Sequence, residues 1–217
     1  MTFPDTAAMT LREICENAMR AGREIDLTGC DYGPHKRSNS YLGVQTYYYF
    51  LAGFVRTLGF AKILEIGTSH GGSMMAIDRG CSASAAERRL VTVDKVDVAG
   101  PGLLGLRNVA RVIGDSRDAA TLLEIKQRLT TPIDLLYIDS KHSYDHTMRN
   151  IQLHGAEFRP RFVILDDIHL NAEMEKVWAE VSAQYRHQAF DASQLAERPG
   201  GFGILDDARV TARPVSA

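Results

Sequence analysis

The sequence predicts an α/β fold with a doubly wound, mostly parallel sheet, and two observations carry this prediction. Short apolar runs alternate with helix-length stretches, at residues 61–66, 90–94, 109–113, 133–139 and 162–166. Repeated strand, helix, strand order gives a parallel sheet with helices on both of its faces. The C-terminal part differs, because HQAFDA and FGILD are joined through the turn RPGG without a helix. Two strands joined in this way indicate an antiparallel pair at one edge of the sheet.

Two amphipathic segments precede the sheet. Residues 10–27 show the apolar spacing of a helix, and Thr10 with Glu13 predict a capping box at its start. Helical periodicity resumes over residues 41–58, and Gly59 suits the C-cap. The polar stretch at 28–40 predicts a surface loop or a lid. We expect one domain over residues 1–217, with the N-terminal helices and the loop or lid at 1–58 and an α/β core at 59–217.

Composition and charge exclude several classes of partner. The formal net charge is -2 and the basic residues are scattered, so no nucleic-acid partner is expected. No stretch approaches the roughly 18 consecutive apolar residues of a membrane span, and the start lacks a secretory pattern. We therefore expect a cytoplasmic protein without a membrane partner. The three cysteines, Cys15, Cys30 and Cys81, lack metal-type spacing and are expected to be reduced, packed thiols.

The first strand of the core leads into the glycine-rich stretch ILEIGTSHGGSM. Ligands of open parallel sheets bind beyond the carboxyl ends of the strands. Gly67, Gly71 and Gly72 let the chain turn and let a ligand approach the backbone, so a cofactor is expected here. A dinucleotide fingerprint would have glycine where Ser69 stands. The carboxylate of Glu65 would also repel a pyrophosphate, so the pattern favours a different cofactor.

Acidic or hydroxyl side chains also end the next two strands. Asp94 ends the second strand, where a carboxylate can accept the hydroxyls of a ribose. Asp115 and Ser116 follow the third strand and suit the amino group and a ring nitrogen of adenine. Each of these residues alone could be a helix N-cap, but their recurrence at successive strand ends favours a ligand site.

Taken together, these motifs resemble the class I S-adenosylmethionine-dependent methyltransferases over roughly residues 41–206. The shared pattern is E-x-G-x-x-x-G-G, an acid after the second strand, G-D-S after the third and I-D after the fourth. The resemblance implies a single methyltransferase domain with a Rossmann-like, seven-stranded sheet that has one antiparallel edge strand, the last strand being inserted antiparallel. It implies S-adenosylmethionine as cofactor, with its methionine part beside Glu65, Gly67, Ser69 and Gly71, its ribose at Asp94, its adenine at Asp115 and Ser116, and Gly72, Ser73 and Asp139 completing the site.

Three further carboxylates are predicted at the same rim of the sheet. The fourth strand ends in Asp139, and the fifth ends in Asp166 and Asp167. Such close anions repel one another unless a cation joins them, and hard oxygen ligands favour Mg²⁺, with Mn²⁺ or Ca²⁺ as alternatives. The competing interpretation is that these acids cap helices or pair with Arg149 or Arg161.

His142 and Lys141 are the candidates for a general base. His142 stands three residues after Asp139 and titrates near neutral pH, whereas Lys141 would first have to lose its proton. D-x-x-H followed by an acidic pair resembles the metal-dependent O-methyltransferases of antibiotic and macrolide-sugar tailoring and the cephalosporin-modifying methyltransferase group. In the sugar-modifying members a histidine at this spacing is the base and three acids hold the metal, often with Glu where Asp166 stands.

The resulting expectation is a metal-dependent O-methyltransferase. It would transfer a methyl group from S-adenosylmethionine to a hydroxyl of a small, natural-product-like acceptor, and family analogy allows a homo-oligomer. Several alternatives stay open at this point. They are an S-adenosylmethionine-binding protein of this fold with non-methylation chemistry, an NAD-dependent oxidoreductase, a metal-dependent hydrolase and a non-catalytic scaffold.

Overall fold

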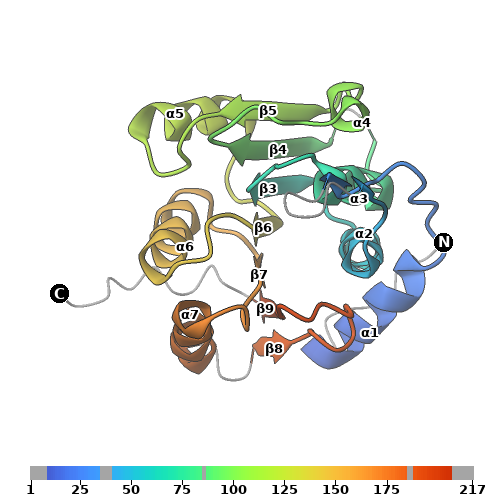
Figure 1. The fold of residues 1–217 in the computed structure, drawn as a ribbon, viewed down its shortest axis with the longest axis vertical. Coiled ribbons are helices and arrows are strands. Elements are labelled where there is room, and N and C mark those ends of the chain that lie inside the picture. The colour runs from blue at the N-terminus through green and yellow to red at the C-terminus, as the bar shows by residue number, and fades with distance from the viewer. Residues whose placement is uncertain (1–8, 35–40, 85–86, 185–187, 207–217) are drawn as a thin grey trace.

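A seven-stranded sheet forms the centre of the protein (Figure 1). The computed structural model describes residues 9–34, 41–84, 87–184 and 188–206. The strand order is β5-β4-β3-β6-β7-β9-β8. The strands of this sheet are β3 (Lys62–Ile66), β4 (Arg89–Asp94), β5 (Val109–Ile113), β6 (Leu135–Ile138), β7 (Phe162–Asp166), β8 (Ala189–Asp191) and β9 (Phe202–Asp206). The predicted doubly wound α/β fold is confirmed.

The C-terminal pair of strands closes one side of the sheet. Strands β3 to β7 pair with one another in parallel, whereas β9 pairs antiparallel with both β7 and β8. The antiparallel pair therefore lies at the sheet edge as expected, with β9 inserted second from the edge and β8 outermost. Asp166 is the register partner of Phe202, so the start of β9 lies beside the carboxyl end of β7.

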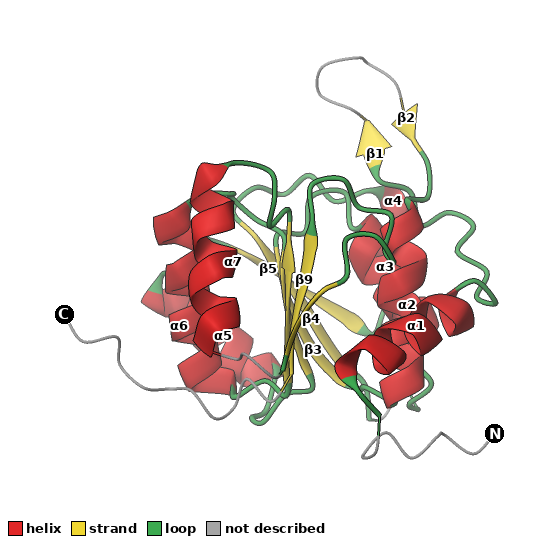
Figure 2. Cartoon of the chain, turned by 90° about the horizontal axis from the view of Figure 1, so that it is seen from below, coloured by secondary structure: helices red, strands yellow, loops and turns green. Residues whose placement is uncertain are grey.

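Helices cover both faces of the sheet (Figure 2). One face carries α1 (Leu11–Gly22), α2 (Thr46–Leu58), α3 (Gly72–Gly80) and the short α4 (Pro101–Leu104). The other face carries α5 (Ala119–Arg128), α6 (Tyr144–Phe158) and α7 (Ala172–Gln184). The predicted capping box of α1 is present, because the Glu13 amide donates to Thr10 Oγ1 and the Thr10 amide donates to Glu13 Oε2. Gly59 ends α2 with a φ of +66°, as a C-cap glycine does.

The segment between α1 and α2 departs from the predicted pattern. The helix expected from residue 41 begins only at Thr46, because Tyr41–Leu42 (β2) pairs antiparallel with Gly33–Pro34 (β1). Gly33 has a φ of +99° and packs against the ring of His70 in the loop after β3. Residues 35–40, on which part of the predicted loop or lid falls, lie outside the described residues.

Close helix packing builds the core on the α1–α2 face. A Cβ atom on Gly53 would lie 1.8 Å from the Ala18 carbonyl oxygen, so only glycine lets α1 and α2 approach so closely. Phe50 and Phe54 of α2 pack against Phe202 and Phe162 of the sheet. The three cysteines are free and buried, as predicted.

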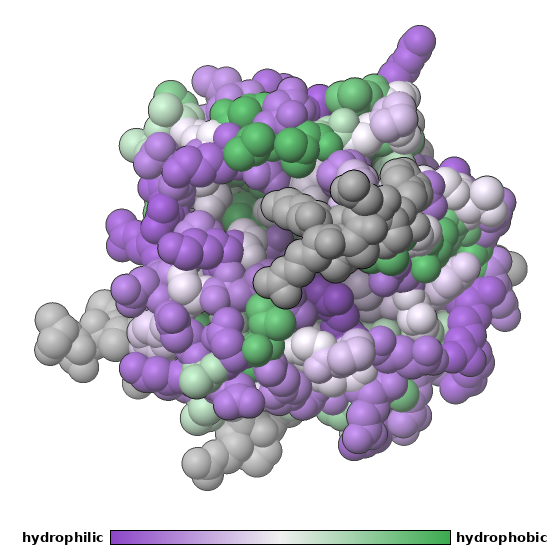
Figure 3. Space-filling view, viewed as in Figure 1, coloured by the Kyte–Doolittle hydropathy of each residue, from purple (hydrophilic) through white to green (hydrophobic). Residues whose placement is uncertain are grey.

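The surface seen in Figure 3 is mostly hydrophilic, with hydrophobic residues gathered in separate small patches. Among the described helices, none combines the length and the hydropathy needed to cross a membrane.

Candidate functional site

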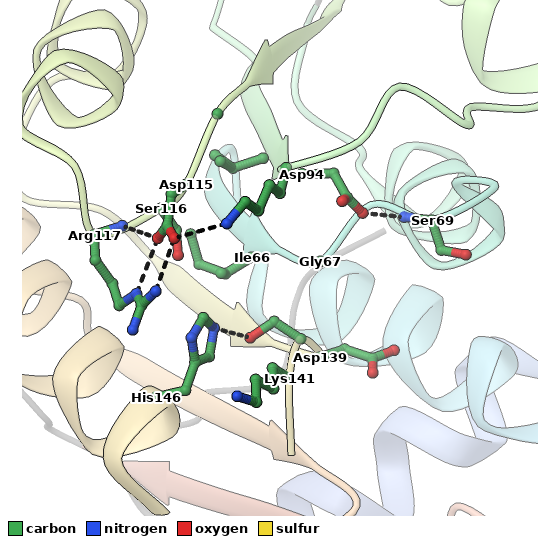
Figure 4. Close-up of a pocket in the computed structure, with 14 residues that line it drawn as sticks. Ile66, Gly67, Ser69, Asp94, Asp115, Ser116, Arg117, Asp139, Lys141 and His146 are labelled. Carbon is green, nitrogen blue, oxygen red and sulfur yellow. Dashed lines mark hydrogen bonds and ion pairs between the residues drawn. The ribbon is translucent and has the colours of Figure 1, made fainter. Parts of the chain in front are cut away.

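A cavity of about 420 Å³ lies beyond the carboxyl ends of β3, β4, β5 and β6 (Figure 4). This is the place where open α/β sheets bind ligands. The cavity is lined by Ile66, Gly67, Ser69, Val93, Asp94, Lys95, Gly114, Asp115, Ser116, Arg117, Asp139, Ser140, Lys141 and His146. Of the residues predicted for the cofactor site, this set contains Gly67, Ser69, Asp94, Asp115, Ser116 and Asp139.

The loop after β3 has a backbone that its sequence makes possible. Gly67 has a φ of +105°, and a Cβ atom there would lie 1.8 Å from the Asp139 carbonyl oxygen. Only glycine therefore lets this loop pass the end of β6. Ser69 follows with a φ of +45°, and its amide donates to Asp94 Oδ2 at 2.8 Å. The loop is thereby tied to the end of β4.

Glu65 lies beneath this loop and does not line the cavity. Its carboxylate is fully buried and accepts hydrogen bonds from Ser73 Oγ and Thr92 Oγ1, both at 2.5 Å. Burial raises the pKa of Glu65 to about 8, against the hydrogen bonds that favour the charged form. Gly71, Gly72 and Ser73 likewise lie outside the cavity lining. These four predicted residues shape the loop and the first turn of α3 from behind.

The acids at the ends of β4 and β5 accept hydrogen bonds from neighbouring groups of the chain. Asp94 accepts from the Ser69 amide through Oδ2 and from the Val96 amide through Oδ1 at 3.1 Å. Asp115 accepts two hydrogen bonds from the Arg117 guanidinium, at 2.9 and 2.7 Å. These hydrogen bonds hold the pKa of the Asp115 carboxyl well below its usual range. Both carboxylates are therefore fixed acceptors on the cavity wall.

Asp139, Asp166 and Asp167 form a second group, which we call the acidic rim. Asp166 is fully buried, and Asp167 follows it with a φ of +56°. His142 Nε2 lies 3.6 Å from Asp139 Oδ1 and 3.4 Å from Asp167 Oδ2. Within the described part of the chain this buried nitrogen has no hydrogen-bond partner. Burial lowers the pKa of His142, but Asp139 and Asp167 outweigh it, so that the pKa lies above its usual value.

Arg198, which the sequence analysis did not single out, is the cation at the acidic rim. Its Nε and Nη2 donate to the two oxygens of Asp166 at 2.9 and 2.6 Å, and Nη2 lies 3.1 Å from Asp167 Oδ1. Asp166 and Asp167 are thus paired with Arg198 rather than with Arg149 or Arg161. A signal was present, because an antiparallel last strand brings the turn before it to the carboxyl end of β7.

The sequence also matches a known family over its central part. Residues 64–168 match the family model described as a methyltransferase domain. The matched range contains all the residues predicted for the site, from Glu65 to Asp167, whereas Arg198 lies beyond it. The resemblance to the class I methyltransferases is confirmed.

Solved structures similar to this chain share its fold. The O-methyltransferase from Bacillus cereus in complex with SAH is 20% identical with a TM-score of 0.55, over 92% of this chain and 93% of that one. TomG from Streptomyces achromogenes, an O-methyltransferase involved in tomaymycin synthesis and solved with SAM, is 18% identical with a TM-score of 0.56, over 93% and 92%. MycE, a methyltransferase from the mycinamycin biosynthetic pathway in complex with Mg, SAH and mycinamycin VI, is 16% identical with a TM-score of 0.50, over 75% and 48%. None of the curated proteins compared with the chain matches it in sequence.

The two candidate bases of the methyltransferase domain lie in different places. Lys141 lines the cavity and is exposed, whereas His142 faces the acidic rim. Figure 4 shows Lys141 on the same side of β6 as His146, while the carboxylate of Asp139 points the other way. His146 also lines the cavity and contacts Ser140 Oγ through Nε2 at 3.1 Å. Its place could have indicated it, since His146 stands in the first turn of α6, directly after the loop that follows β6.

Proposed function

We propose that this protein is an S-adenosylmethionine-dependent O-methyltransferase that acts on a hydroxyl group of a small, natural-product-like acceptor. The observation that carries the proposal is Asp139, which lines the cavity and also faces His142 at the acidic rim. Asp139 therefore links the cavity proposed for the cofactor to His142, the group proposed to accept a proton. The methyltransferase family match supports the reaction class, and MycE, solved with Mg, SAH and mycinamycin VI, supports this acceptor class by analogy.

Different residues of the cavity would bind different parts of the cofactor. We assign the methionine part to the loop at Gly67 and Ser69, the ribose to Asp94, and the adenine to Asp115 and Ser116. When bound, S-adenosylmethionine supplies a methyl group activated by the adjacent sulfonium charge. Glu65 contributes from beneath, because its hydrogen bonds to Ser73 and Thr92 hold the first turn of α3 against β4.

The acidic rim has the donors and the charge for a divalent cation. Its three carboxyl groups outnumber the one guanidinium of Arg198 that contacts them. Asp139 Oδ1 and Asp167 Oδ2 lie 3.6 and 3.4 Å from His142 Nε2, so both carboxylates stand beside the proposed base. Oxygen-rich donors favour Mg²⁺, Mn²⁺ or Ca²⁺. Such an ion would lower the pKa of an acceptor hydroxyl.

His142 is the proposed general base. Its Nε2 faces two carboxylates, which stabilise the imidazolium that forms when the ring takes the acceptor proton. Lys141 lies on the cavity side and is the less favourable candidate, because its ammonium is exposed and must first lose a proton. A cytoplasmic location, a homo-oligomer and the lack of a nucleic-acid partner stay predictions from the sequence.

The first test is a calorimetric titration of chelator-treated protein with S-adenosylmethionine, with and without Mg²⁺. Micromolar cofactor binding, followed by cofactor turnover with a panel of phenols and sugar-like alcohols, is the expected result. NAD titrated in parallel separates the oxidoreductase alternative. Binding of NAD without binding of S-adenosylmethionine would contradict the proposal, and so would turnover that needs no methyl donor.

A further inference from the structure

Asn150 is a polar side chain in the interior of the protein, behind the wall of the cofactor cavity. It lies in α6, it is 0% exposed, and it lies outside the cavity lining. Its side-chain amide makes two hydrogen bonds. Nδ2 donates to the His146 carbonyl at 2.9 Å, and Oδ1 accepts from Ser116 Oγ at 2.7 Å. A buried amide that is paired at both its nitrogen and its oxygen has a fixed orientation.

The orientation of Asn150 decides what the Ser116 hydroxyl can offer to a ligand. The His146 carbonyl can only accept, so the amide nitrogen of Asn150 must face it. The amide oxygen then faces Ser116, and this oxygen also can only accept. The one hydroxyl proton of Ser116 is therefore used within the protein. The lone pairs that remain on Oγ accept a hydrogen bond but cannot donate one.

Ser116 presents this oxygen at the part of the cavity assigned to adenine. Figure 4 shows Ser116 beside Asp115 and Arg117 on the cavity wall. The Asp115 carboxylate already accepts three hydrogen bonds from Arg117, from the backbone amide at 3.1 Å and from Nε and Nη2 at 2.9 and 2.7 Å. In the described part of the chain, Ser116 Oγ makes only the hydrogen bond to Asn150. Ser116 is thus the less occupied acceptor of the two.

An oxygen that only accepts distinguishes adenine from hypoxanthine. Adenine carries an amino group at carbon 6 of the purine, and this group donates hydrogen bonds. Hypoxanthine carries a carbonyl oxygen at the same carbon, and two acceptors that face each other form no hydrogen bond. A site with a fixed acceptor rejects a ligand that lacks the matching donor, because the acceptor is then left unpaired.

We propose that Asn150 is a positioning residue for cofactor selection: by accepting the hydroxyl proton of Ser116, it makes Ser116 Oγ an acceptor that selects adenine over hypoxanthine. This inference rests on the proposed function, because it concerns the same cofactor cavity. It adds a residue that touches no part of the cofactor and acts only through Ser116.

Calorimetric titration with S-adenosylhomocysteine and S-inosylhomocysteine tests the inference without any assay of turnover. We expect wild-type protein to bind the adenine compound at least about tenfold more tightly. Asn150→Leu should lower this preference about threefold or more, because the Ser116 hydroxyl can then rotate and donate to the hypoxanthine carbonyl. A purely structural role of Asn150 would weaken both ligands equally. An unchanged preference in Asn150→Leu would therefore overturn the inference.

Ser116→Ala is the second variant, and it keeps the backbone amide while it removes Oγ. It should lower the preference about as much as Asn150→Leu does. In the double variant Ser116→Ala with Asn150→Leu, the preference should stay within about twofold of Ser116→Ala alone, because Asn150 acts only through the hydroxyl. A further large fall in the double variant would overturn the inference. An unchanged preference in Ser116→Ala would do the same, so the test holds even if Asn150→Leu does not fold.

Two more variants serve as controls. Asn150→Asp keeps an oxygen that accepts from Ser116, whether the carboxyl is ionised or, when protonated, donates to the His146 carbonyl in place of the amide. It should keep the wild-type preference within about twofold. Thr147→Val is the matched control, because Thr147 is also buried in α6 but its hydroxyl contacts Met174 Sδ. A fall in preference in Thr147→Val as large as in Asn150→Leu would count against a specific role of Asn150.

Wild-type binding separates this inference from the proposed function. Wild-type protein that binds neither compound would remove both proposals. Equal binding of the two compounds by wild-type protein would leave the cofactor cavity standing and overturn only the role of Asn150.

Discussion

At the scale of single residues, His142 is the group on which the proposed chemistry depends most. It reaches the acidic rim because it stands three residues after Asp139, on the turn that enters α6. Two carboxylates face its Nε2, and they favour the protonated ring against the effect of burial. A base in this environment is stronger than a free imidazole, and it is active only when it has lost its proton.

Replacement of His142 by Gln should reduce kcat by about 10²- to 10⁴-fold, the usual contribution of a general base. Binding of S-adenosylmethionine should change little, because His142 does not line the cavity. Wild-type kcat should rise with pH and then level off, since the neutral ring is the active form. The pH profile of kcat and a calorimetric titration check both statements. A larger loss of kcat in Lys141→Gln than in His142→Gln would assign the base to Lys141.

Glu65 gives a prediction about stability and pH. Its pKa in the folded protein, about 8, lies above the ordinary value of 4.5, so the folded state binds the proton more tightly than the unfolded state. The contribution of the protonated Glu65 to stability is therefore fully present below about pH 4.5, and it is lost as the pH rises from there through about 8. Between pH 6.5 and 8.5 the loss from this group is about 2 kcal/mol.

The matching variant is Glu65→Gln, which keeps a similar shape without the ionisation. Its free energy of unfolding, measured with urea at pH 6.5 and 8.5, should change less between the two values than that of wild type. An equal change in both proteins would show that Glu65 is not responsible.

At the scale of elements, the loop between β3 and α3 depends on a single glycine. Gly67→Ala forces a side chain into a backbone with a φ of +105° and against the Asp139 carbonyl. We expect a loss of at least about 2 kcal/mol in the free energy of unfolding, together with weaker cofactor binding. Gly59→Ala is the matched control, because its φ is +66° but no atom lies within 4 Å of the added Cβ. It should cost only about 1 kcal/mol. Equal losses in both variants would contradict the proposed close passage of the loop past β6.

Strand β9 is short, but its direction decides where Arg198 lies. Because it runs antiparallel to β7, the turn before it meets the carboxyl end of β7. That contact brings Arg198 to Asp166, at a separation of 32 residues along the chain. A parallel strand in the same place would have ended at the rim and left the arginine at the opposite edge of the sheet.

At the scale of the whole molecule, a ligand that binds only the folded state should stabilise all of it. S-adenosylmethionine at about 100 times its Kd would add about 2.7 kcal/mol to the free energy of unfolding. For a chain of this size the thermal midpoint should rise by roughly 5 to 10 °C. Thermal unfolding with S-adenosylmethionine and with NAD at equal concentration measures the effect. A rise with NAD alone would favour the oxidoreductase alternative.

The sequence by itself determined the fold class, the order of the strands along the chain and the residues at their carboxyl ends. These features are local, because strand periodicity, glycine-rich turns and acids after apolar runs can be read within a few residues. The positions of Gly67, Asp94 and Asp139 around one cavity follow once the sheet is known to be parallel.

The tertiary structure alone decided how these residues are partnered. Glu65 lies beneath its loop and not in the cavity, because Ser73 and Thr92 approach it from α3 and β4. Asp166 meets Arg198 and neither Arg149 nor Arg161, because β9 is inserted between β7 and β8. The pairing of charged groups depends on contacts between segments that are distant in the sequence. The spacing of residues along the chain does not reveal these contacts.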